Sequence, residues 1–260
     1  MNKLLLTALM ALGTALGASA QAYQVSFDYT NTNTAAGDHS GKTSYLLGAD
    51  NVAQAGSGIF VETFDARNGN RNGFACGLDT PSSLVSITGG TYGFRSGTLA
   101  NVAAAPAGDT SCYAYGPTQG GPLPDKVTIN YSGLLSELGA SSLNYFGLYY
   151  GSIDTFNDLT FYNANGGVIA RITGTSLISQ FKGTSGNQTA DSSNIYVNLF
   201  FDPAERFTSF AFSTSGIAFE MDNLAVGVNV ARNVPEPASL ALVGLAIGAI
   251  VMVRRRKLRL

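Results

Sequence analysis

Apolar and polar residues alternate along much of this chain, and a period of two is the signature of a strand with one buried face. Residues 23–30 read Tyr-Gln-Val-Ser-Phe-Asp-Tyr-Thr, in which every second side chain is apolar. Further strands are predicted at 59–64, 84–88, 126–131, 145–150, 159–162, 168–172, 195–201, 207–212, 217–220 and 224–230. Sustained helical periodicity is nearly absent. The pattern therefore predicts an all-β fold, an antiparallel β-sandwich.

One hairpin is especially well marked. Its strands are 159–162 and 168–172, and the connection Asn-Ala-Asn-Gly-Gly between them supplies the residues that adopt the backbone angles of tight turns. The only helix that we expect in the body is a single turn at 134–138. Three stretches, 31–41, 102–124 and 183–193, have the composition of surface loops.

The N-terminus has the three parts of a secretory signal peptide. Lys3 gives a positive start, residues 4–16 are an apolar run, and Ala18-Ser19-Ala20 is a small-x-small cleavage site. We predict a signal peptide at 1–20, removed by signal peptidase. An uncleaved N-terminal anchor is the alternative, but the apolar run is short for one.

The C-terminus also has three parts. Pro235, Glu236 and Pro237 precede an apolar stretch of 16 residues at 238–253, a little shorter than the roughly 20 residues that span a membrane as a helix. A basic tail follows, made of Arg254, Arg255, Arg256, Lys257 and Arg259. Basic side chains reach the lipid head groups and stay on the cytoplasmic side of the inner membrane. The body of the protein would then lie on the opposite side.

This combination resembles a PEP-CTERM sorting signal, the tag recognised by exosortases of Gram-negative bacteria. The resemblance implies that an exosortase recognises Pro235-Glu236-Pro237 and removes the helix and tail, so the protein is anchored only transiently before it reaches the cell surface or extracellular matrix. The expected domains are then a signal peptide at 1–20, an extracellular sandwich at 21–232 and a sorting signal at 233–260. A plain C-terminal anchor, with the prolines merely starting the helix, is the alternative.

Charge changes the picture once the two ends are set aside. The whole chain has a net charge of −2, but residues 21–237 contain 9 basic and 17 acidic residues and carry −8. An acidic body argues against binding nucleic acid and against docking on anionic lipid. Cys76 and Cys112 are the only cysteines, and in an exported protein we expect them to form a disulfide. His39 is the only histidine, which leaves a catalytic cysteine without an evident partner.

Three stretches of the body resemble a family of exosortase-dependent surface proteins. They are 145–154 (Tyr-Phe-Gly-Leu-Tyr-Tyr-Gly-Ser-Ile-Asp), 157–162 (Asn-Asp-Leu-Thr-Phe-Tyr) and 218–226 (Ala-Phe-Glu-Met-Asp-Asn-Leu-Ala-Val). The resemblance covers about residues 60–230 and implies a jelly-roll-like arrangement of the sandwich.

Four carboxylates are candidates for a structural calcium site. Glu62 and Asp65 lie near the start of the sandwich, and Glu220 and Asp222 lie near its end. The first and last strands of many jelly rolls are neighbours, so these hard oxygen ligands could meet on Ca²⁺. No contiguous calcium-binding loop appears in the sequence, and no other cofactor is expected.

Two further pairs bear on function. Tyr149 and Tyr150 are adjacent in a predicted strand and face opposite ways, so one could present its ring to a sugar, or both could pack inside. Asp154 and Asp158 could act as the paired carboxylates of a glycosidase, or could shape the turn between two strands.

Taken together, these features predict a non-enzymatic surface or matrix protein beside exopolysaccharide or in a biofilm. A carbohydrate-binding or adhesin module is an alternative, and a secreted polysaccharide-degrading enzyme is another.

Overall fold

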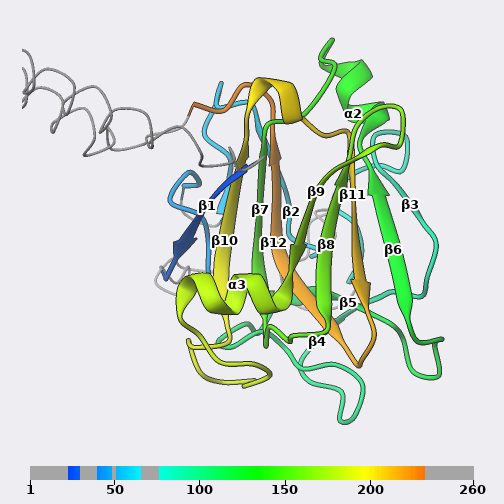
Figure 1. Ribbon diagram of the computed structural model, residues 1–260, viewed down its shortest axis with the longest axis vertical. Helices are drawn as coiled ribbons and strands as arrows, with labels where there is room; N and C mark the ends of the chain where they lie inside the picture. The colour runs from blue at the N-terminus through cyan, green and yellow to red at the C-terminus, as the bar shows by residue number, and fades with distance from the viewer. Residues whose placement is uncertain (1–22, 30–39, 49–50, 66–75, 232–260) are drawn as a thin grey trace, which may run out of the picture. The chain divides into compact units, whose positions relative to one another are not determined.

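The computed structural model describes residues 23–29, 40–48, 51–65 and 76–231. Among these residues, twelve strands form two antiparallel sheets (Figure 1). The larger sheet has the order β1-β10-β7-β12-β5-β4, with β2 also paired to β12, and the smaller has the order β3-β6-β11-β8-β9. The fold is all-β and sandwich-like, as the alternating pattern predicts.

The bounds of the strands are as follows. The larger sheet contains β1 (Tyr23–Asp28), β2 (Ile59–Glu62), β4 (Gly93–Ser96), β5 (Cys112–Gly116), β7 (Tyr145–Gly151), β10 (Ile195–Phe201) and β12 (Phe219–Gly227). The smaller sheet contains β3 (Ser86–Thr88), β6 (Asp125–Asn130), β8 (Asn157–Tyr162), β9 (Val168–Thr173) and β11 (Ser209–Thr214).

Strand prediction was accurate where the alternation is long and less so where it is short. The hairpin of β8 and β9 is confirmed, with Leu159 opposite Ile172. The segments predicted at 217–220 and 224–230 are parts of one strand, β12, whose pairing with β7 shifts register between Asp222 and Ala225. The prediction of 102–124 as loop was wrong at β5, and β4 was also missed. Both strands are short, and neither shows the sustained alternation of apolar and polar residues that predicts a strand.

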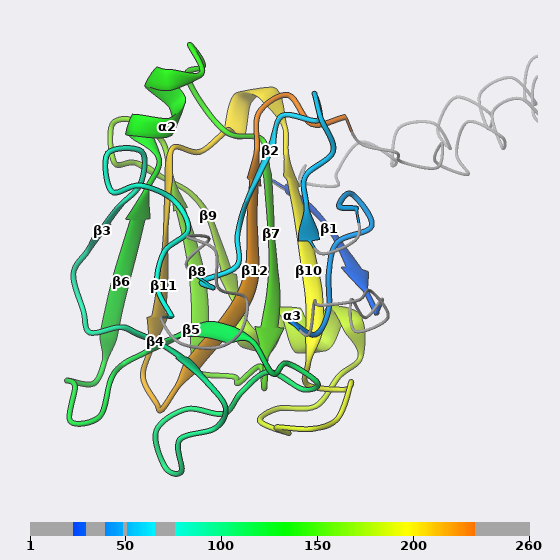
Figure 2. The ribbon, with the colours of Figure 1, turned by 180° about the vertical axis from the view of Figure 1, so that it is seen from behind.

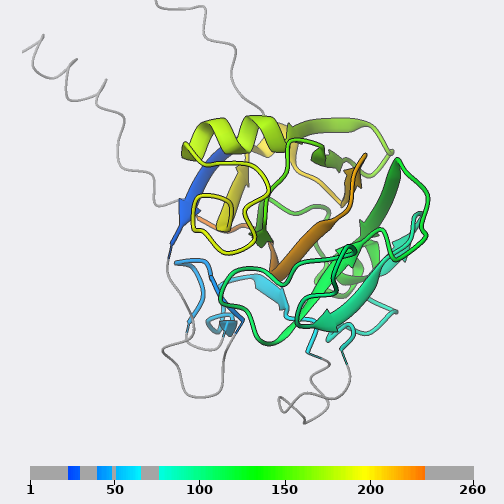
Figure 3. The same cartoon turned by 90° about the horizontal axis from the view of Figure 1, so that it is seen from below.

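In the described ranges, two α-helices accompany the sheets. The short helix α2 (Ser132–Glu137) is near the single turn expected at 134–138, whereas α3 (Gly174–Phe181) was not expected. The Thr173 hydroxyl accepts a hydrogen bond from the Ser176 amide at the start of α3, a common helix-starting signal that the sequence contained. The Phe181 ring packs 5.4 Å from the ring of Phe27 on β1. Helix α3 therefore joins an edge of one sheet to an edge of the other, as the view from below shows (Figure 3).

Aromatic rings fill the space between the sheets. Phe146 of β7 lies 4.7 Å from Phe210 of β11 and 5.0 Å from Phe161 of β8, measured between ring centroids. Phe207 packs against the same group, 5.1 Å from Phe161. All four side chains are completely buried. Edge-to-face contacts of this kind add to the free energy gained by burying each ring.

The larger sheet is buried on its other face as well. Every residue of β7, β10 and β12 is buried, because the segments 40–48 and 102–109 cover the side that faces away from the smaller sheet (Figure 2). This explains why 145–150 and 195–201 are nearly continuous runs of apolar and aromatic residues rather than clean alternations.

The predicted signal peptide at 1–20 lies outside the described residues. So do Pro235-Glu236-Pro237, the apolar stretch 238–253, the basic tail of Arg254, Arg255, Arg256, Lys257 and Arg259, and also His39. Across the ranges that are described, no helix is long and apolar enough to cross a membrane.

Candidate functional site

The predicted disulfide is present. Cys76 and Cys112 are bonded, and their Cα atoms lie 5.5 Å apart. Cys112 begins β5 and is buried in the core between the sheets. The bond therefore fixes the start of the segment 76–85 to the larger sheet.

Glu62, at the end of β2, holds the same segment in place a few residues further on. Its carboxylate accepts hydrogen bonds from the backbone amides of Phe64, Asp79 and Thr80, at 3.1, 2.6 and 2.9 Å. Burial raises the pKa of Glu62, and these backbone hydrogen bonds act against that shift. The position of Glu62 is thus explained by a structural role, because both carboxylate oxygens already accept hydrogen bonds.

Asp65 and Asp222 approach a buried carboxyl group that was not singled out from the sequence, Asp109. Burial is the largest influence on the pKa of Asp109 and raises it to about 7, and the nearby charge of Asp65 acts in the same direction, whereas hydrogen bonds with Ser111 and Asp222 lower it. Ser111 donates to Asp109 at 2.8 Å through both its amide and its hydroxyl. No motif identifies Asp109 in advance, because its segment, 107–111, is a loop in which aspartate is ordinary.

Glu220 lies apart from this group. Its two carboxylate oxygens accept hydrogen bonds from the Ala104 amide at 2.9 Å and the Ser152 hydroxyl at 3.1 Å. Burial raises the pKa of Glu220 to about 8, so the carboxyl group is mostly protonated at neutral pH. It lines an open hollow of about 530 Å³ between the loop 98–104 and the turn at 217–218.

The calcium site predicted from Glu62, Asp65, Glu220 and Asp222 is not formed. Glu62 and Glu220 are each occupied by separate backbone donors, and only Asp65 and Asp222 come near the same group. In the part of the chain that the structure describes, no three His, Cys, Asp or Glu side chains are grouped so that they could hold a metal ion. The prediction placed the right strands beside each other, since β2 pairs with β12, but it did not account for the faces on which the side chains lie.

The predicted ligand platform of Tyr149 and Tyr150 was wrong, because neither ring is exposed. Tyr150 points between the sheets and stacks on Phe219 at 4.5 Å. Tyr149 faces the other way, but the segments over the larger sheet cover it: its hydroxyl donates to the Ala107 carbonyl at 2.5 Å, and Lys42 lies over its ring. The second interpretation, that both rings pack inside, is the one that the structure supports.

Asp154 and Asp158 lie near each other in the chain but have different partners. Asp154 accepts a hydrogen bond from the Ser185 hydroxyl at 3.0 Å. Asp158, on β8, forms a 2.6 Å ion pair with Arg171 of the neighbouring strand β9. Asp154 thus supports a loop, and Asp158 forms a cross-strand pair. Both contacts agree with the interpretation that these carboxylates have structural roles.

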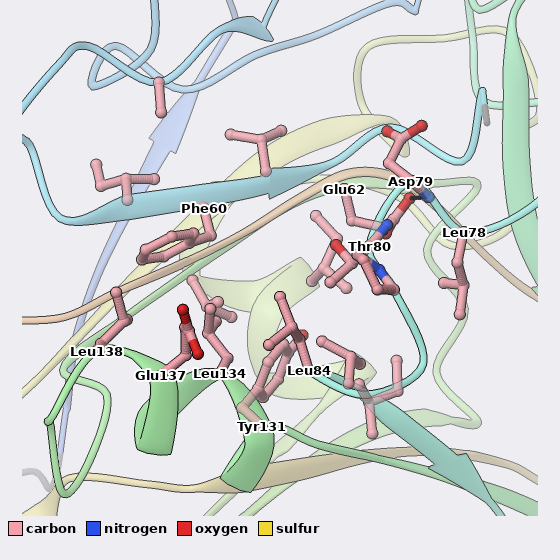
Figure 4. A pocket seen from close by; sticks show the side chains of 18 of the residues that line it. Phe60, Glu62, Leu78, Asp79, Thr80, Leu84, Tyr131, Leu134, Glu137 and Leu138 are labelled. Atoms are coloured by element: carbon pink, nitrogen blue, oxygen red, sulfur yellow. Dashed lines mark hydrogen bonds between the residues drawn. The ribbon is translucent and has the colours of Figure 1, made fainter. Parts of the chain in front are cut away.

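A cavity that the sequence did not predict opens between the two sheets (Figure 4). We call it the lateral cleft, and its volume is about 350 Å³. One wall is β2 with part of β12, the second is α2 with the end of β6, and the third is the segment 78–85. Its apolar lining comprises Ala53, Ile59, Phe60, Val61, Phe64, Leu78, Pro81, Leu84, Val85, Ile129, Tyr131, Leu134, Leu138, Leu224 and Val226.

The polar groups of the lateral cleft are few and mostly acidic. They are Glu62, Asp79, Thr80 and Glu137, besides the Tyr131 hydroxyl. Glu137 lies in the last turn of α2, is exposed, and makes no hydrogen bond or ion pair with any described residue. A mostly apolar cavity with a few polar groups has the character of a small-molecule site. Its residues are spread over 53–226, so no local motif could have revealed it.

Comparison with known proteins identifies the C-terminal segment. Residues 233–257 match the family model of the PEP-CTERM protein-sorting motif. The chain carries a PEP-CTERM sorting signal. The signal implies export, processing by an exosortase and delivery to the cell surface.

Comparison with characterised proteins and solved structures adds little for the body. No characterised protein sequence matches the chain. Among solved structures, the K2 cleaved adhesin domain of Lys-gingipain is similar over 67% of this chain and 100% of its own, with 13% sequence identity and a TM-score of 0.37. At that level of similarity, the adhesin domain carries no argument about ligand or partner.

Proposed function

We propose that the sandwich domain is a non-enzymatic component of the cell surface or extracellular matrix, delivered through the PEP-CTERM route and working beside exopolysaccharide. The observation that carries this proposal is the sorting motif at 233–257. The N-terminal signal peptide predicted from the sequence supports it, since both ends then belong to one export route.

The properties of the body suit such a setting. The sandwich has a disulfide, which persists in oxidising compartments, and residues 21–237 carry a net charge of −8, which favours a protein that stays in solution beyond the membrane. The carboxylates weighed as catalytic groups have structural partners, since Asp154 accepts a hydrogen bond from Ser185 and Asp158 pairs with Arg171. These contacts favour a binding or matrix role over hydrolysis.

Mass spectrometry of the protein recovered from its own host tests the export route. We expect a mature N-terminus at Gln21 and a C-terminus near Pro235-Glu236-Pro237, without the apolar stretch and basic tail. A variant with Glu236→Ala should keep the tail if the motif is what the exosortase recognises. Recovery of wild-type protein that still ends at Leu260 would overturn the proposal.

The matrix role needs its own experiment, because processing alone does not establish it. We expect the processed protein to co-sediment with the exopolysaccharide of its host, and enzymatic digestion of that polysaccharide to release it. Retention of the protein in a polysaccharide-deficient host at wild-type level would argue instead for an adhesin that contacts protein partners.

A further inference from the structure

We propose that the lateral cleft is a binding site for a small amphiphile that has an apolar body and a neutral or positively charged head group. The cleft is the hollow between β2, α2 and the segment 78–85 (Figure 4). This inference is independent of the export route, and no part of it rests on the sorting signal.

The first support is that the cavity is preformed. Its outer wall, the segment 78–85, is held at three points: the Cys76–Cys112 disulfide, the amide contacts of Glu62, and a 2.8 Å hydrogen bond from the Leu134 amide to the Leu84 carbonyl. A wall fixed in this way cannot collapse inward to fill the space. Binding then requires little ordering of the protein, which favours affinity.

The second support is the contrast with the opposite side of the sandwich. There, α3 lies across the edges of the two sheets, and Phe181 packs against Phe27. On the cleft side, α2 has only six residues. It contributes Leu134 to the lining, and Leu138 follows directly after it, but about 350 Å³ is left unfilled. That volume falls in the usual range for sites of small ligands.

The third support concerns charge and decides the kind of ligand. The ionisable side chains of the lining, apart from Tyr131, are the acidic residues Glu62, Asp79 and Glu137, and no Lys, Arg or His is among the described residues that line the cleft. An anionic head group would meet only like charge there. Glu137 has no partner among the described residues and lies beside Leu138 in the wall (Figure 4), so its carboxylate is placed to pair with a cationic head group.

The experiment uses the full-length protein, the neutral fluorescent probe N-phenyl-1-naphthylamine, and Leu84→Trp as a variant that fills the cleft. The chain has no tryptophan, so the new indole also reports its own surroundings, and blue-shifted emission shows that it lies inside. Val168→Trp is the matched control, since Val168 is 62% exposed and lies on β9, away from the cleft.

We expect saturable probe binding in the wild type and in Val168→Trp, with at least a tenfold loss of affinity in Leu84→Trp. Comparing variants removes any contribution from the apolar ends of the chain, which are the same in all three. Leu138→Trp, at the mouth of the cleft, is a second filling variant in case Leu84→Trp does not fold. Equal probe binding in the wild type and in a folded filling variant would overturn the proposal.

Competition with ligands of one chain length then tests the charge. We expect decylammonium and decanol to displace the probe from the cleft at concentrations at least tenfold lower than decanoate. Glu137→Gln should reduce the advantage of decylammonium over decanoate severalfold. If decanoate competes as well as decylammonium, the assignment of head-group charge is wrong.

Discussion

The two faces of the larger sheet are both buried, but they are built from different chemistry. The inner face, toward the smaller sheet, is packed with rings such as Phe146 and Tyr150 and contains few polar atoms. The outer face carries Tyr145, Tyr149 and Tyr196, and the hydroxyl of each forms a hydrogen bond. Burial alone therefore does not define the core of this protein.

The difference shows how each face obtains its specificity. On the inner face, shape fixes the arrangement, because rings must interlock without voids. On the outer face, polar partners fix which loop lies where: Asn223 donates to the carbonyls of Ser40 and Lys42, and the Tyr149 hydroxyl donates to the Ala107 carbonyl. Such hydrogen bonds contribute modestly when made but are costly to leave unmade.

The largest expected effect comes from the inner face. Phe161→Ala removes a fully buried ring that contacts Phe146, Phe201, Phe207 and Phe210, and we expect it to lower the free energy of unfolding by about 3–5 kcal/mol. Urea unfolding measures this. Tyr162→Ala on the same strand faces away and is half-buried, so it should cost only about 1 kcal/mol. Equal losses in both variants would contradict the assignment of faces.

The second-largest expected effect comes from removing the disulfide. Replacing Cys76 and Cys112 together with alanine opens a loop with a sequence separation of 36 residues, and we expect a loss of about 3–4 kcal/mol in the free energy of unfolding. Thermal unfolding of the oxidised wild type and of the variant gives the difference. The wild type in reducing agent should match the variant; a variant as stable as the oxidised protein would show that the bond constrains little.

A third prediction concerns pH and belongs to the outer face. The pKa of Glu220 is raised by burial to about 8 in the folded protein, above its ordinary value near 4.5, so folding favours the protonated form. Its contribution to stability is complete below about pH 4.5 and is lost as the pH rises toward 8. We expect the wild type to lose at most about 1.4 kcal/mol more per pH unit in this window than Glu220→Gln. Urea unfolding at pH 5, 6, 7 and 8 measures both slopes, and parallel slopes would contradict the assignment.

The smallest expected effect is a difference in stability between two tyrosine variants. Tyr145→Phe removes a hydroxyl that bonds to Asn198 at 2.7 Å and to Ser44 at 3.0 Å, so we expect a loss of about 1–2 kcal/mol. The hydroxyl of Tyr150 is buried without a well-formed hydrogen bond, and Tyr150→Phe should be neutral or slightly stabilising. Urea unfolding of the two variants under the same conditions compares them directly. The reverse order would mean that the outer hydrogen bonds contribute little.

The fold was predictable because alternation along a strand is a local property. The pattern of apolar residues located ten of the twelve strands in the described residues, including both halves of β12, the β8–β9 hairpin, and the nearly continuous apolar runs of β7 and β10. The two missed strands, β4 and β5, are short and follow segments rich in glycine, threonine and serine, so their pairing comes from contacts between distant parts of the chain. Helix α3 could have been found from its capping Thr173.

The sites were less predictable than the fold, because the face on which a side chain lies depends on register. Glu220 and Asp222 lie on the outer face of β12, whereas Glu62 accepts its hydrogen bonds at the lateral cleft between the sheets, and the sequence does not show this. Tyr149 looked available because the covering segment 102–109 is distant in sequence. The lateral cleft could not be predicted for the same reason, since β2, α2 and 78–85 meet only in the folded chain.

The place of β12 has a consequence for the order of events during export. This strand is the last of the domain in sequence, yet it lies in the interior of the larger sheet and pairs with β7, β5 and β2. In a chain that crosses the membrane from its N-terminus, the sheet stays split until residues 219–227 have emerged. The sorting signal begins at residue 233, shortly after the end of β12, so in an exported chain the last strand that the sheet needs and the sorting signal emerge one directly after the other.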